Sequence, residues 1–304
     1  MSAIAADIES VATRHRDNRS RVARMLHGLK RFIRTKPLGA ICGALIVAVL
    51  LVALFAPLLA PKDPTQTSLI DSLRPPSAAY PFGTDRNGRD MLSRIIYGAR
   101  VSLGIGLGAV VLGITLGSVI GLVGGFLGGA VDMAMQRCVD MLQAFPTLVL
   151  AMAIVAAAGI SFQNVIIAIG ITLAPGASRV VRSSVLSVRE YQYIDAARSL
   201  GATDMRLMLR HVLPNVAAPI IVLTSVVIGQ AIIAEATLSF LGLGVQEPQP
   251  SWGSMLSGNA QRHIEDAPWL VIFPGLALAL VVFAFNMFGD ALRDVLDPRL
   301  RGSH

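Results

Sequence analysis

The sequence predicts an all-α protein that crosses a membrane six times. Hydrophobic residues make up 54% of the 304 residues and charged residues only 15%. The apolar residues form long uncharged blocks rather than the short alternating runs of a soluble core, and about 20 apolar residues suffice for one span. Nine basic residues precede the first block, between Arg14 and Lys36, so the net charge of +7 is better explained by a basic membrane flank than by nucleic-acid binding.

The first predicted span covers residues 38–60, after a basic cytoplasmic region at residues 1–37. This block exceeds the core of a cleavable signal, about 7 to 15 residues, so we expect a retained helix. An external loop at residues 61–100 follows and is rich in proline at first. Its last part, GRDMLSRIIYGAR, has apolar residues at helical spacing, which predicts a short interfacial helix before the second span.

The second block runs from residue 101 to residue 130 and carries glycine at every fourth position. This spacing leaves a groove along one face, which favours close approach of another helix, although a glycine-rich helix without a particular partner is the alternative. The glycines in register are Gly113, Gly117, Gly121, Gly125 and Gly129.

The uncharged run at residues 141–178 would be about 57 Å long as one helix, nearly twice the hydrocarbon thickness. We therefore divide it into a third and a fourth span, with the turn at residues 159–164. A fifth block at 215–243 and a sixth at 269–288 complete a core at residues 101–289, and residues 290–304 form a tail. Most basic residues then lie on the side of both termini, which is assigned to the cytoplasm, although the loop at 61–100 also holds six.

The segment at residues 179–214 is the predicted cytoplasmic loop between the fourth and fifth spans. It holds six arginines, whose burial in lipid would cost on the order of 18 kcal/mol, so it must stay in water. Gly201 ends a short helix within it, Thr203 or Asp204 can cap a second helix, and Pro214 marks the return to the membrane. The apolar face of the short helix comprises Tyr193, Ala196, Ala197 and Leu200. Such a face is expected of a helix that docks into a groove of a partner protein. It is equally expected of a helix that folds back on the bundle.

The spacing of this loop resembles the "EAA" loop of membrane subunits of bacterial ABC importers. The resemblance rests on Asp195-Ala196-Ala197, then Gly201, then His211-Val212-Leu213-Pro214-Asn215. Asp195 replaces the usual Glu, which keeps the charge and shortens the reach. Other stretches are similar to the second permease of the dipeptide, oligopeptide and nickel group: YPFGTDRNGRDMLSRIIYGARVSL, AEATLSFLGLG, PSWGSML and FNMFGDALRDVLDPR.

The resemblance implies a type I ABC importer permease fold in a bacterial inner membrane, with the short helix as a coupling helix against an ATPase. It implies a complex with a second related permease, two P-loop ATPase subunits that bind ATP and Mg, and a periplasmic or lipid-anchored binding protein. The solute would be a peptide or a related small molecule. The positions carried over are Asp195, Ala196, Ala197, Gly201 and Pro214, and the face argument adds Tyr193 and Leu200.

The chain shows no motif for catalysis, for a metal or for a cofactor of its own. Its three lysines do not follow P-loop glycines, and its His and Cys residues are scattered. Glu235 is the one ionisable residue well inside an apolar block, about 30 Å along the fifth span. It either reaches external water or acts at the outer mouth of a pathway, five residues beyond Gln230.

Two other classes of function are weighed against the importer. One is a secondary transporter without ATP, although no inverted repeat is evident. The other is a membrane scaffold whose cytoplasmic helix recruits a soluble partner. Neighbouring genes for a P-loop ATPase, a second permease and an exported binding protein would favour the importer.

Overall fold

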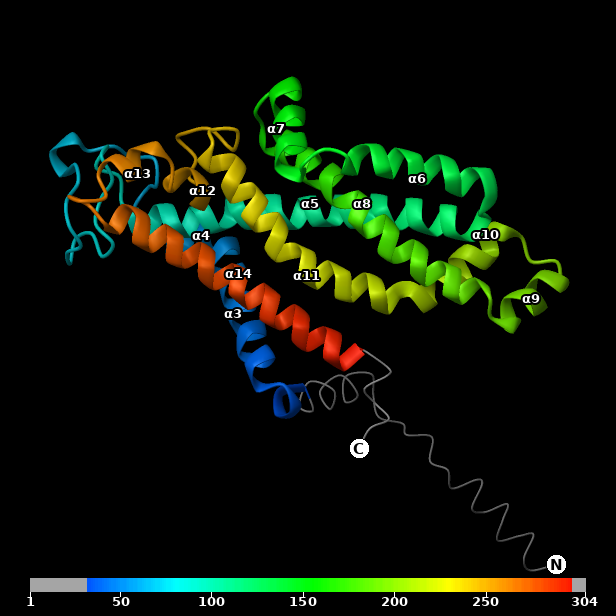
Figure 1. Cartoon of the computed structure of the whole chain (residues 1–304). Helices are drawn as coiled ribbons and strands as arrows, with labels where there is room; N and C mark the ends of the chain where they lie inside the picture. The colour runs from blue at the N-terminus through cyan, green and yellow to red at the C-terminus, as the bar shows by residue number, and fades with distance from the viewer. Residues whose placement is uncertain (1–31, 297–304) are drawn as a thin grey trace, which may run out of the picture.

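The computed structural model describes residues 32–296, and every described regular element is a helix (Figure 1). Five helices are long and apolar enough to cross a membrane, and a bent pair makes a sixth candidate. The predicted all-α polytopic fold is confirmed. Most of the basic N-terminal region and the end of the C-terminal tail lie outside the described residues. The helices are α3 (Pro37–Leu54), α4 (Ala56–Leu59), η1 (Leu69–Asp71), α5 (Met91–Leu127), α6 (Gly129–Gln143), α7 (Thr147–Ala158), α8 (Phe162–Arg189), α9 (Gln192–Ser199), α10 (Asp204–Leu207), η2 (Met208–Val212), α11 (Leu213–Phe240), α12 (Trp252–Met255), α13 (Gly258–Arg262) and α14 (Trp269–Leu296).

The helix α5 contains both the expected interfacial helix and the second span. Asp90 caps its N-terminus by accepting a hydrogen bond from the backbone N–H of Ser93, and the helix then runs for 37 residues, about 55 Å. No helix breaker separates the two parts, so the expected short helix is not a separate element. The helix ends at Gly128, whose φ of 69° suits glycine.

The third span is a broken one, unlike the single helix expected to begin near Met141. Helix α6 begins at Gly129 and α7 follows after a bend of 89°. Pro146 stands at the break, where its missing N–H and its restriction of the preceding residue prevent a continuous helix. In Figure 1, α6 runs beside the long helices while α7 projects away from them.

The fourth span continues to Arg189, so the loop expected to begin at Arg179 begins eleven residues later. Its arginines are held as part of the helix by acidic partners on α6. Arg179 donates to Asp140 at 2.8 Å, and the Nε of Arg182 donates to Asp132 at 2.6 Å. At about 42 Å this helix is longer than the hydrocarbon layer, so the charged end can remain in water without a break.

The glycine face of α5 is covered by α8, and this pair makes the most extensive contact between described helices. A Cβ added at Gly117 would lie 2.5 Å from the carbonyl oxygen of Ala174, and one at Gly121 would lie 2.5 Å from that of Ser178. Gly113 and Gly125 face α8 in the same way. Gly129 does not, because it lies beyond the end of α5 at a φ of 55° with open space around it. Backbones can approach this closely only where side chains are absent.

We expect Gly117→Ala to destabilise the protein by about 1–3 kcal/mol, because the new methyl group overfills the contact with α8. Thermal unfolding in detergent, followed by circular dichroism, measures the effect. Gly176→Ala is the matched control, since that glycine also lies within a helix but has no atom within 4 Å of the added carbon. Equal unfolding temperatures for the two variants would show that the close contact at Gly117 is unimportant.

Candidate functional site

The helix α9 lies at the opposite end of the long helices from α12 and α13 (Figure 1). Ile194 anchors it, because its side chain is fully buried in a cluster with residues of α5, α8 and η2. Sequence reasoning missed this residue, although a large aliphatic residue between polar neighbours was a usable signal. Arg198 makes a second contact between α9 and the bundle, because its guanidinium lies 6.0 Å from the centre of the Phe126 ring on α5.

The expected apolar face of α9 is divided between the bundle and solvent. Ala197 is half-buried and packs against the cluster around Ile194. Tyr193, Ala196 and Leu200 are exposed, Leu200 to 90%. The helix is therefore folded back on the bundle along one side and presents a small apolar side outward. Asp195 is also exposed and accepts a long hydrogen bond, 3.4 Å, from Arg198.

Gly201 ends α9 with a φ of 83°. The backbone N–H of Gly201 donates to the carbonyl of Arg198, and that of Ala202 donates to the carbonyl of Ala197, which is the Schellman arrangement. Thr203, rather than Asp204, then caps the next helix by accepting from the backbone N–H of Arg206. The direction of α9 is thereby fixed relative to the helix that follows.

Pro214, the residue expected at the return to the membrane, lies within one long helical run and not at a break between helices. The run from Asp204 to Phe240 is a single candidate span. Its five residues before Leu213 form a π-helix. The widening follows from Pro214, which has no N–H for the usual hydrogen bond to the preceding turn. The side chain of Asn215 donates instead to the carbonyl of His211 at 2.6 Å.

Gln230 lines a cavity of about 570 Å³ between α7, α8 and α11. The other hydrogen-bonding side chains in its lining are Gln143, Thr147 and Thr172, and the remainder is mostly apolar. Among the residues that the structure describes, no ionisable one lines it. A groove of this composition can exchange hydrogen bonds with an uncharged polar solute without fixing it by charge.

Glu235 lies away from this cavity, and of the two alternatives that the sequence leaves open, a carboxylate that reaches external water does not fit its buried position. Its side chain is 0% exposed, and one oxygen accepts from Ser239 at 2.7 Å. Five residues along a helix correspond to a rotation of about 140°, so Glu235 and Gln230 point to different sides of α11.

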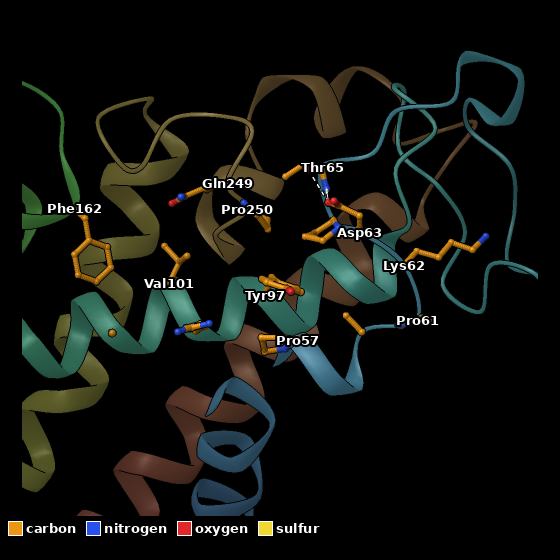
Figure 2. A pocket seen from close by; sticks show the side chains of 14 residues that line it. Pro57, Pro61, Lys62, Asp63, Thr65, Tyr97, Val101, Phe162, Gln249 and Pro250 are labelled. Atoms are coloured by element: carbon orange, nitrogen blue, oxygen red, sulfur yellow. Dashed lines mark hydrogen bonds between the residues drawn. The ribbon is translucent and has the colours of Figure 1, made fainter. Parts of the chain in front are cut away.

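A larger cavity of about 920 Å³ lies between the external loop, α5 and the segment before α12 (Figure 2). Lys62 and Asp63, both labelled in Figure 2, are engaged locally. The ammonium of Lys62 lies 3.3 Å from the centre of the Tyr80 ring, and Asp63 accepts two hydrogen bonds from Thr65.

A buried ion cluster holds the external loop to the segment after α11. Arg89 is 5% exposed and donates to Asp85 at 2.6 Å and to Glu247 at 3.0 Å. Arg94 is also buried and donates to the carbonyl of Pro64. The hydrogen bonds from Arg89 hold the pKa of the Glu247 carboxyl below its usual range. Sequence reasoning missed the cluster, because Asp85 and Arg89 lie in a loop, where their spacing gives no helical signal, and Glu247 is remote in the sequence.

Comparison with known proteins identifies the family. Residues 113–302 match the binding-protein-dependent transport system inner membrane component, and residues 28–76 match the N-terminal TM domain of oligopeptide transport permease C. The dipeptide transport system permease protein DppC of Alkalihalophilus pseudofirmus is 47% identical over 263 residues, which is 86% of each chain. The glutathione transport system permease protein GsiD of Shigella flexneri is 44% identical over 277 residues, 91% of each chain.

A solved structure shares the fold. The inward facing MetNI methionine ABC transporter matches 68% of this chain and 98% of its own chain, with a TM-score of 0.56 at 16% identity. That likeness concerns the fold, while the sequence matches assign the family. This chain belongs to the inner-membrane components of binding-protein-dependent transport systems and is a permease subunit of an ABC importer of the dipeptide/oligopeptide type.

Proposed function

We propose that this chain carries peptides or related small solutes across the bacterial inner membrane, with α9 receiving the motion of an ATPase. The exposed apolar side of α9 carries the proposal. This side belongs to a helix whose opposite side is held against the bundle by Ile194. The helix leads toward α11 through the turn at Gly201. A docking element must be both accessible and rigidly tied to what it moves, and α9 meets both conditions.

The complex we propose contains a second related permease, two P-loop ATPase subunits and a periplasmic or lipid-anchored binding protein. ATP and Mg bind to the ATPase subunits, so this chain is a non-catalytic subunit. The broken span supports a permease partner, because α6, α7 and the bend between them expose large apolar side chains, of which Phe145 lines the Gln230 cavity. These side chains include Met133 and Met141 on α6 and Phe145 at the bend. Surrounding lipid covers the rest of the apolar surface.

The orientation we propose puts both termini and α9 in the cytoplasm. The arginines of α8 and of the segment after it support this side, since cytoplasmic segments carry an excess of basic residues. The ion cluster around Arg89 then lies outside, where its positive charges are neutralised by Asp85 and Glu247.

The solute class we propose rests on two observations. The relatives include a dipeptide and a glutathione permease. The Gln230 cavity offers uncharged hydrogen-bonding side chains, which suit the amide groups of a peptide. The route would pass along this cavity, and Glu235 would not line it, because its carboxyl is buried on another side of α11.

We expect Ala196→Trp to weaken ATPase binding by about 1–3 kcal/mol, roughly tenfold or more in affinity, because the indole overfills a contact built for a methyl group. Co-purification of the ATPase, and ATP-driven peptide uptake into proteoliposomes that enclose ATP and receive the binding protein from outside, measure this effect. Ala196→Ser keeps the side chain small and serves as the control. Ala196 is a better position for the test than Ala197, since Ala197 is half-buried against the bundle. Full ATPase retention and uptake with tryptophan present would refute the docking proposal.

We expect Gln230→Leu to raise the KM for peptide uptake severalfold, because a hydrogen bond of about 1 kcal/mol to the solute is lost. ATPase co-purification should not change, since Gln230 is remote from α9. Gln246→Leu makes the same replacement at an exposed site outside the cavity and should leave KM unchanged. The same KM in both variants would exclude Gln230 from the route.

A further inference from the structure

We propose that Glu235 is a positioning residue that clasps the external segment, residues 241–256, to α11 and α5. The inference rests on the proposed ATPase coupling and adds the means by which motion of α11 reaches the outer side. The starting observation is a carboxyl group that is completely buried yet lines neither large cavity. A buried carboxyl without a partner is costly, so its surroundings indicate its role.

Three serines from three segments surround this carboxyl. Ser239 lies one turn further along α11 and donates to Oε1 at 2.7 Å. Ser102 of α5 and Ser251, the residue that caps α12, lie beside the carboxyl. All three are at most 3% exposed. The second carboxyl oxygen makes no hydrogen bond of good geometry within the described residues, so a small shift of either neighbouring hydroxyl can engage it.

The helix α12 is wedged between α5 and α11 at this point. The backbone N–H of Trp252 donates to the hydroxyl of Ser102 at 3.2 Å, and its indole N–H donates to the carbonyl of Ile95 at 3.1 Å. A Cβ added at Gly253 would lie only 2.3 Å from the carbonyl oxygen of Ala236. The start of α12 therefore touches the backbones of both long helices, and Glu235 lies where the three segments meet.

The external segment has a second anchor at Glu247. That carboxylate binds Arg89, but its side chain is 56% exposed, so water competes with the contact. The Glu235 site excludes water, and its hydrogen bonds are correspondingly harder to replace. Of the two anchors, Glu235 is the one that joins the segment directly to α11.

The other end of the same helical run adjoins α9. Residues 204–240 form a single candidate span, and the ring of His211 in it lies 6.5 Å from the ring of Tyr193. A displacement received at α9 can thus travel along one helix to Glu235. Because the clasp holds the external segment to α11, the segment moves with this helix instead of sliding along it.

Hydrogen exchange on the intact chain in detergent tests the clasp itself. We expect Glu235→Leu, which keeps the volume but removes the hydrogen bonds, to speed exchange of the amides in α12 about tenfold. Glu235→Gln keeps an acceptor and should restore protection. Thr237→Val is the matched control, because the hydroxyl of Thr237 lies on the same helix as Glu235 and donates within α11 to the carbonyl of Ile233 at 2.8 Å. If Glu235→Leu does not fold, Glu235→Asp, which keeps the carboxyl and shortens its reach by one methylene, should show the same faster exchange.

Transport by the reconstituted complex tests the role in coupling. We expect the leucine variant to assemble fully and hydrolyse ATP, while the peptide taken up per ATP falls about tenfold and the glutamine variant stays near the parent protein. Unchanged exchange in α12 would overturn the clasp. Faster exchange with an unchanged uptake-to-ATP ratio would overturn the positioning role. Absence of ATP-driven uptake by the parent complex would instead refute the proposed function, and the role in coupling with it, whereas the exchange result would still report on the clasp.

Discussion

The contact between the glycine face of α5 and the backbone of α8 is the interaction on which the rest of the structure depends. In lipid, apolar side chains gain little by leaving their surroundings, so helices associate through close packing and hydrogen bonds. Gly113, Gly117 and Gly121 allow backbone-to-backbone approach over two turns. The same two helices carry the Arg182 pairing with α6 at one end and contact the external segment at the other. Both candidate functional regions are therefore attached to the same rigid pair of helices, α5 and α8.

A second constraint is the cost of charge near lipid, and the chain meets it by pairing rather than by avoidance. Arg179 and Arg182 extend from α8 toward Asp140 and Asp132 on α6. At the other end of the molecule, Arg89 is buried and yet satisfied by two carboxylates. These pairs explain how a helix can continue past the hydrocarbon layer and how a loop with many arginines can be compact.

The long run from α10 to α11 links the two ends of the molecule. A π-helix lies near the end of this run that adjoins α9, and the buried Glu235 lies near the end that adjoins α12. The helix α9 is fixed against the run by Ile194 and by the turn at Gly201, so the exposed side of α9 and the segment at residues 241–256 are connected by few flexible joints. Such a connection is what an importer requires if energy enters on one side and access changes on the other.

The sequence by itself determined which apolar blocks are long enough to cross a membrane, because their lengths reflect the thickness of the bilayer directly. It also determined the glycine face of α5 and the short helix that ends at Gly201, since both depend on spacing within one helix and on local backbone conformation. The break before α7 was missed although Pro146 is a local signal for it, whereas the length of α8 could not be predicted, because it depends on carboxylates of another helix. Tertiary structure alone decided that Ile194 is the anchor of α9 and that Glu235 faces three serines rather than water. Periodicity places a side chain on a face of its own helix, but which neighbour covers that face is settled only when the helices pack together.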